Sequence, residues 1–301
     1  MDPTLAAPAV RPPAPWLDRT EYPFAAHYLT VEDAQLHYVD EGEGPPLLFV
    51  HGTPTWSFLF RHQIKALAAH YRCLAPDHIG FGLSDKPAAY PYTVQQHAQN
   101  LVALVDALQL HYITLVVHDF GGPIGLYLAT QRPAAIARLV ICNTWAWSSA
   151  DDPAFIKFSK VLRSPLLPLL YKGLNFSPRV LIPRAFADRR KLTKAIHRHY
   201  YKPYRRPRER GGSLGFARSL LEAQEWFQQL WEARDAFCHR PTLLLWGMED
   251  RFLSPRYLER FLAHFPQAKA LRLEGTGHFV PEEAASEVTH AIKAFLAEPL
   301  P

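Results

Sequence analysis

The stretch VVHDFGGPIG, residues 116–125, constrains this sequence more than any other. Its apolar start predicts a buried strand, and the two glycines after the aspartate let a helix begin at once and pack close to that strand. Asp119 would then stand at a sharp strand-to-helix turn, where a nucleophilic serine is the usual residue. An aspartate before a helix can also act only as its N-cap, because its carboxylate accepts hydrogen bonds from free N–H groups.

Short β-rich runs alternate with helical stretches around this turn. Within residues 25–147 the runs are QLHYVDEG, PLLFVHG, RCLAPD, ITLVVHD and ARLVICN, and helices are expected to begin near Ser57, Thr93 and Gly121. This alternation predicts an α/β fold with a mostly parallel sheet flanked by helices. We expect the first two runs to pair as an antiparallel hairpin.

The patterning divides the chain into four parts. Residues 1–24, with five prolines in their first sixteen residues, predict an extended N-terminal arm, and residues 25–147 form the first part of the core. Residues 148–238 lose the strand signals and show helical periodicity, which predicts an inserted helical cap. Strand signals return in residues 239–301 as PTLLLWG and AKALRLEG, the second part of the core.

The cysteines Cys73, Cys142 and Cys238 stand singly, without metal-binding spacing. Their odd number favours reduced thiols and a cytoplasmic protein. We find no signal-peptide pattern and no apolar run of membrane-spanning length. The sequence lacks a phosphate-binding glycine loop, and His197 and His199 lie among like charges, so we expect no cofactor and no metal.

Positive charge is concentrated in residues 184–210, which hold eleven Lys or Arg residues and two acids. Such a run is most often a solvated surface, but it can also attract a membrane surface or a partner enzyme. Tyr200, Tyr201 and Tyr204 lie between the charges. No recognised nucleic-acid module surrounds them, so we do not expect nucleic acid as a partner.

Two polar residues follow Asp119 in an informative order. Asp250 comes just beyond one apolar run, in LLLWGMEDRF, and His278 comes beyond the next, in LEGTGHFVPEE. Since the carboxyl ends of parallel strands meet at one edge of a sheet, we expect these side chains to lie near Asp119. Each residue alone could be an ordinary cap or loop residue. Together, the order nucleophile, acid, histidine predicts a hydrolase triad of Asp119, His278 and Asp250.

The segment HGTPTWSFLFR contributes the expected oxyanion hole. The backbone N–H groups of Thr53 and Phe120 are placed to hold a developing negative charge, and a cis bond to the proline after Thr53 would fix the turn. We also assign His51, Trp145 and Trp147 to the substrate pocket, because each lies at or soon after the end of a predicted buried strand. Core packing is the alternative role for the tryptophans.

These motifs together resemble the haloalkane dehalogenase family of α/β-hydrolases. The resemblance rests on HGTPTWSFLFR, PDHIGFGLSDKP, VVHDFGG, NTWAW, WGMEDRF and GTGHFVPEE, and it covers residues 25–150 and 238–298. It implies an α/β-hydrolase fold with Asp119 as nucleophile, His278 as base and Asp250 as acid. In another subfamily the acid follows the preceding strand, a region that here holds asparagine and tryptophan.

The chemistry explains why an aspartate is needed. A carboxylate that displaces a leaving group from carbon becomes an ester, which water can hydrolyse, whereas a serine would become an inert ether. His278 would activate the water and Asp250 would orient the imidazolium. We therefore expect a small or medium-sized apolar substrate with a carbon–halogen bond or a strained ring.

Two positions depart from the family pattern. Dehalogenases hold the departing halide with a tryptophan after the nucleophile and an asparagine in the first loop, or with a second tryptophan in the cap. In this sequence Phe120 stands at the position of the tryptophan, and Thr53 stands at the position of the asparagine. Loss of one donor typically costs about 3 kcal/mol of transition-state stabilisation. We therefore expect halide release to be slower than in a dehalogenase that has both donors.

Three alternatives stay open. The related β-lactone decarboxylases of long-chain olefin synthesis need no halide site. Epoxide hydrolases resemble the family in fold and nucleophile and add cap tyrosines, for which Tyr171, Tyr200, Tyr201 and Tyr204 are candidates. Finally, the scaffold could serve as a binding protein without activity, because a fold does not fix a function.

Overall fold

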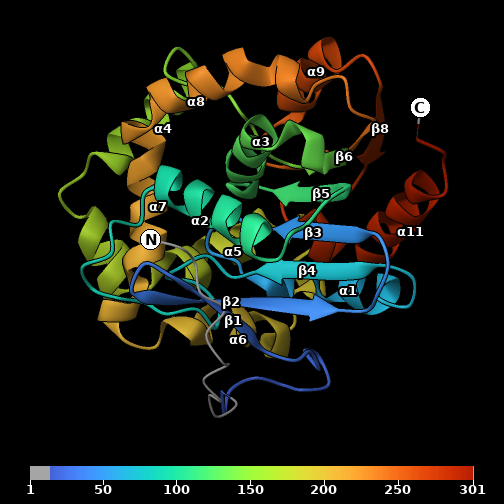
Figure 1. The fold of residues 1–301 in the computed structure, drawn as a ribbon. Coiled ribbons are helices and arrows are strands. Elements are labelled where there is room, and N and C mark those ends of the chain that lie inside the picture. The colour runs from blue at the N-terminus through green and yellow to red at the C-terminus, as the bar shows by residue number, and fades with distance from the viewer. Residues whose placement is uncertain (1–13, 301) are drawn as a thin grey trace.

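The computed structural model describes residues 14–300, and an eight-stranded sheet runs through them (Figure 1). The strand order is β1-β2-β4-β3-β5-β6-β7-β8. The strands are β1 (His27–Val31), β2 (Ala34–Glu41), β3 (Pro46–Val50), β4 (Arg72–Pro76), β5 (Ile113–His118), β6 (Ile136–Cys142), β7 (Thr242–Gly247) and β8 (Ala268–Leu273). β2 is antiparallel to both neighbours, and all pairings from β4 to β8 are parallel. The predicted mostly parallel sheet is confirmed.

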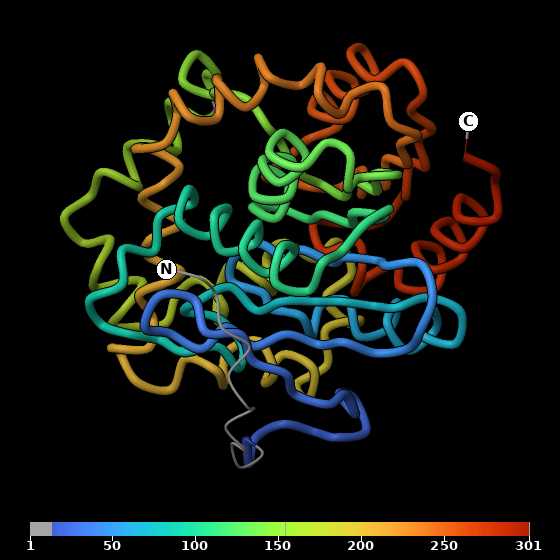
Figure 2. The backbone as a smooth tube through the Cα atoms, in the orientation of Figure 1, coloured from blue at the N-terminus to red at the C-terminus, as the bar shows by residue number. Residues whose placement is uncertain are grey.

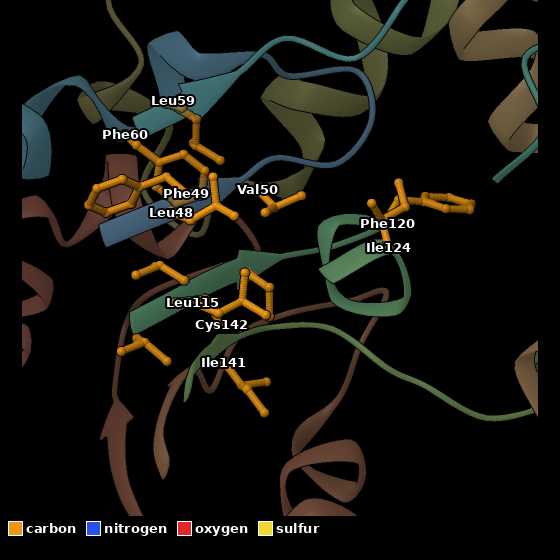
Figure 3. Packing of buried hydrophobic residues seen from close by; sticks show 14 of the residues in the cluster. Leu48, Phe49, Val50, Leu59, Phe60, Leu115, Phe120, Ile124, Ile141 and Cys142 are labelled. Carbon is orange, nitrogen blue, oxygen red and sulfur yellow. The ribbon is translucent and has the colours of Figure 1, made fainter. Parts of the chain in front are cut away.

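The central strands are apolar because both faces of the sheet are covered. Every residue of β5 and β7 is buried, whereas the edge strand β8 has exposed positions. A strand with one solvated face would instead alternate apolar and polar residues. Figure 3 shows Phe49 of β3, Leu115 of β5 and Ile141 of β6 in this core, with Phe60 from the segment after β3.

Helices join the parallel strands. They are α1 (Arg61–Leu67), α2 (Val94–Ala107), α3 (Gly121–Gln131), α9 (Pro255–His264), α10 (Val280–Glu283) and α11 (Ala285–Leu296), with short turns η1 (Ser57–Phe60) and η2 (Pro133–Ala135). The connection from β3 to β4 moves toward β1, and that from β4 to β5 moves toward β8. Right-handed crossovers therefore place α1 and α2 on opposite faces. The three predicted helix starts are confirmed, and the Thr93 hydroxyl accepts a hydrogen bond from the Gln96 N–H at the start of α2.

The strand order reverses at β3, so the carboxyl ends of β3 and β5 lie side by side. In open α/β sheets this switch point is where ligands bind. The loop after β3 carries Thr53, and the turn after β5 carries Asp119. The topology alone therefore brings these two predicted site residues together.

The predicted pairing of the first two runs is wrong. β4 lies between β2 and β3, and β2 forms its hairpin with β1 instead. The hairpin turn is only Glu32 and Asp33, with Glu32 at φ 53°. The crossover through α1 inserts β4 beside β3, which separates two strands that are adjacent in sequence.

Helices and turns fill the chain between β6 and β7, and residues 143–241 contain no strand. The elements are α4 (Pro153–Leu162), η3 (Leu169–Gly173), η4 (Ser177–Leu181), α5 (Ile182–Ala185), η5 (Arg189–Lys191), α6 (Lys194–Tyr201), η6 (Lys202–Tyr204), η7 (Pro207–Arg210), α7 (Gly211–Glu222), α8 (Gln224–Glu232) and η8 (Ala233–Ala236). Figure 1 shows α4 and α7 at the left, the side to which the arrows of β3 and β5 point, and Figure 2 traces the backbone in the same orientation. The cap boundaries at 148 and 238 stay a prediction.

The N-terminal arm falls partly outside the described residues, which begin at residue 14. Its described part packs on the core: Tyr22 shares a 2.5 Å hydrogen bond with the Ser57 hydroxyl and lies against the Trp56 ring. The Asp18 N–H donates to His199 of α6 at 3.0 Å. Residues 14–24 therefore tie the first loop of the core to the inserted helices.

The three cysteines are free and buried, which confirms the predicted thiols. Within residues 14–300, no helix has the length and apolar character needed to cross a membrane. The same residues contain no group of three or more His, Cys, Asp or Glu side chains arranged to hold a metal ion.

Candidate active site

Asp119 stands at the turn between β5 and α3 with φ at 53°, a left-handed backbone that non-glycine residues rarely adopt. The surroundings enforce it: the Thr144 hydroxyl donates to the Asp119 carbonyl, and α3 starts two residues later. A Cβ at Gly121 would meet the Val50 carbonyl oxygen at 2.0 Å, and one at Gly122 would meet the Thr144 hydroxyl at 1.8 Å. Both glycines are therefore required for this close turn.

The two oxygens of the Asp119 carboxylate face different groups, the backbone N–H of Thr53 and the imidazole of His278. Its Oδ1 accepts a 2.7 Å hydrogen bond from the Thr53 N–H, and its Oδ2 lies 3.5 Å from Nε2 of His278. Gly52 permits this approach, because a Cβ there would come within 2.0 Å of Asp119 Oδ1. The peptide bond from Thr53 to Pro54 is cis, as expected. The turn after β3 thus holds the carboxylate beside the imidazole.

Asp250 binds the far side of the imidazole. Its Oδ2 lies 2.7 Å from Nδ1 of His278, and its Oδ1 accepts backbone N–H bonds from Phe252 and Leu253. Burial lowers the pKa of His278, but the Asp250 and Asp119 carboxylates outweigh burial and raise the pKa to about 10. Burial raises the pKa of Asp250, yet His278 and the two N–H donors lower it overall. The structure brings together all three residues of the predicted triad.

Asn143 supports this acid, a role that the sequence interpretation missed. It follows β6 with φ at 26°, and its Nδ2 donates 2.8 Å to Oδ2 of Asp250. Its Oδ1 accepts 2.9 Å from the Gly247 N–H at the end of β7. The feature of the sequence that could have indicated this role is an asparagine directly after a predicted buried strand. Asn143 therefore fixes Asp250 relative to two adjacent strands.

Glu283 is a second missed residue. It is buried, and its carboxylate accepts hydrogen bonds from the N–H groups of Gly277 at 2.8 Å and Asp188 at 2.7 Å. The His278 N–H in turn donates 2.9 Å to the Ala185 carbonyl. The signal was the glutamate pair that follows the histidine in HFVPEE. These bonds tie the loop that carries His278 to the inserted segment at residues 185–188.

A cavity of about 380 Å³ opens above the triad, a volume in the range of small-molecule sites. Asp119 and His278 both border it. Much of its border is apolar or aromatic, including Phe155 and Phe158 of α4 and Leu220 of α7. Asp119 and His278 therefore face a space that suits an apolar molecule.

Phe120 and Thr53 also border the cavity. The Phe120 ring packs edge-on against Trp145 at 4.8 Å and stacks on Phe216 at 4.5 Å, so it presents only carbon next to Asp119. The Thr53 hydroxyl is buried and has no hydrogen-bond partner. Trp145 borders the same cavity, as predicted. Thr53 is therefore the unpaired side-chain hydroxyl beside Asp119.

Neither His51 nor Trp147, which were assigned to the pocket, borders this cavity. Trp147 instead borders an adjoining cavity that shares Ser149, Arg256 and Tyr257 with it. The His51 ring is buried, with Nδ1 2.7 Å from the Gly52 carbonyl and Nε2 accepting from the His78 N–H. Trp147 instead packs in an aromatic cluster, stacked on Tyr257 and covered by the Arg260 guanidinium. His51 therefore links the loops after β3 and β4, whereas Trp147 packs against α8 and α9.

Of the four candidate tyrosines, only Tyr171 borders the cavity. The Tyr200 hydroxyl donates to Glu282, and the Tyr204 hydroxyl donates 3.1 Å to the Pro54 carbonyl. Tyr201 packs against His197 on the cap side. Burial raises the pKa of Tyr171 to about 12. Of the four tyrosines considered as proton donors, Tyr171 is therefore the one placed at the cavity.

Comparison with known proteins agrees with this geometry. Residues 45–285 match the family model described as alpha/beta hydrolase fold. The chain is 36% identical to haloalkane dehalogenase 2 of Mycobacterium tuberculosis, over 90% of this chain and 94% of that protein. It is also 36% identical to the cis-3-alkyl-4-alkyloxetan-2-one decarboxylase of Shewanella oneidensis, over 93% of this chain and 90% of that protein.

A solved structure gives the same result. The haloalkane dehalogenase DatA of Agrobacterium tumefaciens superposes with a TM-score of 0.81 at 28% identity, covering 90% of this chain and 96% of that one. Sequence and structure thus point to one group of enzymes. The chain belongs to the α/β-hydrolase family and, within it, to the haloalkane dehalogenase-like enzymes.

Proposed function

We propose that Asp119 attacks a saturated carbon of an apolar substrate and that His278 activates the water that frees the product. The observation that carries this proposal is the 3.5 Å separation of Asp119 Oδ2 and His278 Nε2 at the border of the cavity. In the first step the carbon–oxygen bond to Asp119 forms as the bond to the leaving group breaks. The electron pair of the broken bond goes with the leaving group.

In the second step water attacks the carbonyl carbon of the Asp119 ester. His278 takes a proton from the water, and Asp250 stabilises the resulting imidazolium. The N–H groups of Thr53 and Phe120 hold the oxyanion, in support of which Thr53 already donates to Oδ1. Collapse of the intermediate releases an alcohol and restores the carboxylate.

The substrate class is a compound with a carbon–halogen bond or a strained ring. A relative at 36% identity is named a haloalkane dehalogenase, and the cavity border supports an apolar alkyl group. An epoxide is less well supported, because Tyr171 alone of the four tyrosines is near enough to protonate a ring oxygen.

A β-lactone is the second candidate, favoured by Phe120. The phenyl ring gives a departing halide no N–H donor, whereas a lactone keeps its leaving carboxylate attached to the substrate. Asp119 would open the ring at the alkoxy carbon. Loss of CO₂ would then form the carbon–carbon double bond as the bond to Asp119 breaks. This route consumes no water.

A side-by-side assay tests the proposal, with bromoalkanes, epoxides and cis-β-lactones as substrates and bromide, diol and alkene as readouts. We expect bromide or alkene from the wild type and neither from Asp119→Asn. His278→Phe separates the two candidates: it traps the ester formed from a bromoalkane, whereas alkene formation does not need activated water. Turnover by Asp119→Asn at the wild-type rate would overturn the proposal.

A further inference from the structure

The outer surface of α4 and η3 carries an unusual set of exposed apolar side chains. Nine large hydrophobic residues are exposed in the described part of the chain, and six of them fall between residues 156 and 174. We call this set the apolar cap face: Ile156, Phe158, Val161, Leu166, Leu169 and Leu174. Single exposed hydrophobic residues are ordinary, but a cluster of this kind marks an interaction surface.

The same segment has a buried inner side. Leu162, Leu167 and Tyr171 form a separate small core with Leu214 and Ala217 of α7. The segment therefore needs no further partner to be held in place. Its outward residues are not buried against any other part of the described chain. Figure 1 shows α4 at the outer edge of the molecule.

Charge decides what kind of partner fits. Residues 153–187 contain six Lys or Arg residues and no acid. Lys157, Lys160, Arg163 and Lys172 are exposed among the apolar residues. Asp151 and Asp152 precede this stretch, but within it the exposed apolar side chains have only cations as charged neighbours along the chain. This pattern matches the interface of an anionic bilayer, where hydrocarbon lies beneath negative headgroups.

We propose that the apolar cap face docks on an anionic membrane surface. The basic run at residues 184–210 is a weaker docking surface, because none of the exposed large hydrophobic residues lies in it. Its Tyr200 and Tyr204 point inward, and the Arg210 guanidinium is occupied by backbone carbonyls such as that of Gly173.

The position of the apolar cap face beside the cavity also bears on how substrate enters, an inference that rests on the proposed function. Phe158 belongs to the apolar cap face and borders the catalytic cavity. Docking would place the rim of the cavity at the headgroup level of the bilayer. An apolar substrate dissolved in the membrane would then reach Asp119 without crossing water.

The test is flotation of the full-length protein with vesicles of phosphatidylcholine, with and without phosphatidylglycerol. We expect binding only to the anionic vesicles, weakened by salt. Lys157→Glu with Lys160→Glu should weaken binding by about thirtyfold or more. The matched control is Arg205→Glu with Arg208→Glu, two exposed cations outside the apolar cap face, which should change binding less than about threefold.

A second pair of variants tests the apolar part. Leu166→Ser with Leu169→Ser should weaken binding by about tenfold or more, whereas Tyr112→Ser with Leu300→Ser, exposed elsewhere, should not. None of these residues borders the cavity, so turnover of a water-soluble substrate should be unchanged. Asp119→Asn should bind vesicles like the wild type, which separates docking from catalysis.

Three outcomes would overturn the proposal. The first is failure of the wild type to float with anionic vesicles. The second is a loss of vesicle binding in the control variants as large as in the test variants. The third is a protein that does not bind vesicles but forms a concentration-dependent dimer, which Leu166→Ser with Leu169→Ser abolishes. The last result would assign the apolar cap face to contact between two copies of the chain.

Discussion

Asn143 Nδ2 donates 2.8 Å to the same Asp250 oxygen that contacts His278 Nδ1. This bond holds the acid of the triad in place and favours its ionised form. Asn143→Ala should therefore lower kcat by about thirtyfold with little change in KM, since hydrogen bonds to charged groups are worth about 2 kcal/mol. Steady-state kinetics on any turned-over substrate measures this effect.

The control for Asn143 is Asn143→Asp, which preserves shape and suits the φ of 26°. It places a second carboxyl group against Asp250, so like-charge repulsion should raise the pKa of the pair and move the acidic limb of the rate profile upward. Identical pH profiles for Asn143→Asp and the wild type would contradict this positioning role.

The pKa of His278 should depend on Asp119. The two carboxylates together raise it to about 10, so removal of one charge in Asp119→Asn should lower it. The ester intermediate also lacks that charge, so the imidazole becomes a free base at lower pH once the ester has formed. An NMR titration of the imidazole in both proteins measures the shift. An unchanged or higher pKa in Asp119→Asn would contradict the geometry.

The leaving-group site predicts a gain of function. Phe120→Trp with Thr53→Asn adds two N–H donors beside Asp119, where the ring of Phe120 now offers none. If a halide limits turnover, kcat for a bromoalkane should rise by about a hundredfold. The same variant should not accelerate ring opening of a β-lactone. No rise in bromide release would mean that the natural leaving group is not a halide.

A buried ion pair predicts a stability effect. Arg61 binds Glu282 through both terminal nitrogens, and both side chains are almost fully buried. Arg61→Ala removes the buried guanidinium and leaves Glu282 only the Tyr200 hydroxyl and the half-exposed His62, so the free energy of unfolding should fall by about 3–5 kcal/mol. Arg132→Ala, which breaks an exposed pair with Asp106, should cost less than about 1 kcal/mol. Urea unfolding of both variants makes the comparison, and equal losses would refute it.

Local patterns predicted the sharp turn at Asp119, the meeting of Asp119, Asp250 and His278, and most of the sheet. Asp119, Asp250 and His278 each follow an apolar run, and parallel strands deliver such positions to one edge, so their convergence follows from chain order. The predicted hairpin of β2 with β3 was wrong because strand neighbours depend on crossovers. Nothing in the sequences of β2 and β3 indicates that β4 lies between them.

The pocket border was harder to predict, because burial alone does not tell which side of a loop faces a cavity. Trp145 and Trp147 are two residues apart in one segment, yet the first borders the cavity and the second packs against α9. Asn143 and Glu283 were missed for a related reason. Their partners, Asp250 and the N–H groups at 187–188, are distant in sequence and meet only in the fold.

The most direct test of the account is the intact mass of His278→Phe after incubation with a bromoalkane that the wild type converts. We predict a mass increase equal to one alkyl group, with peptide mapping that places the ester on Asp119. An unmodified protein, or an adduct on any other residue, would contradict the claim that this carboxylate is the nucleophile.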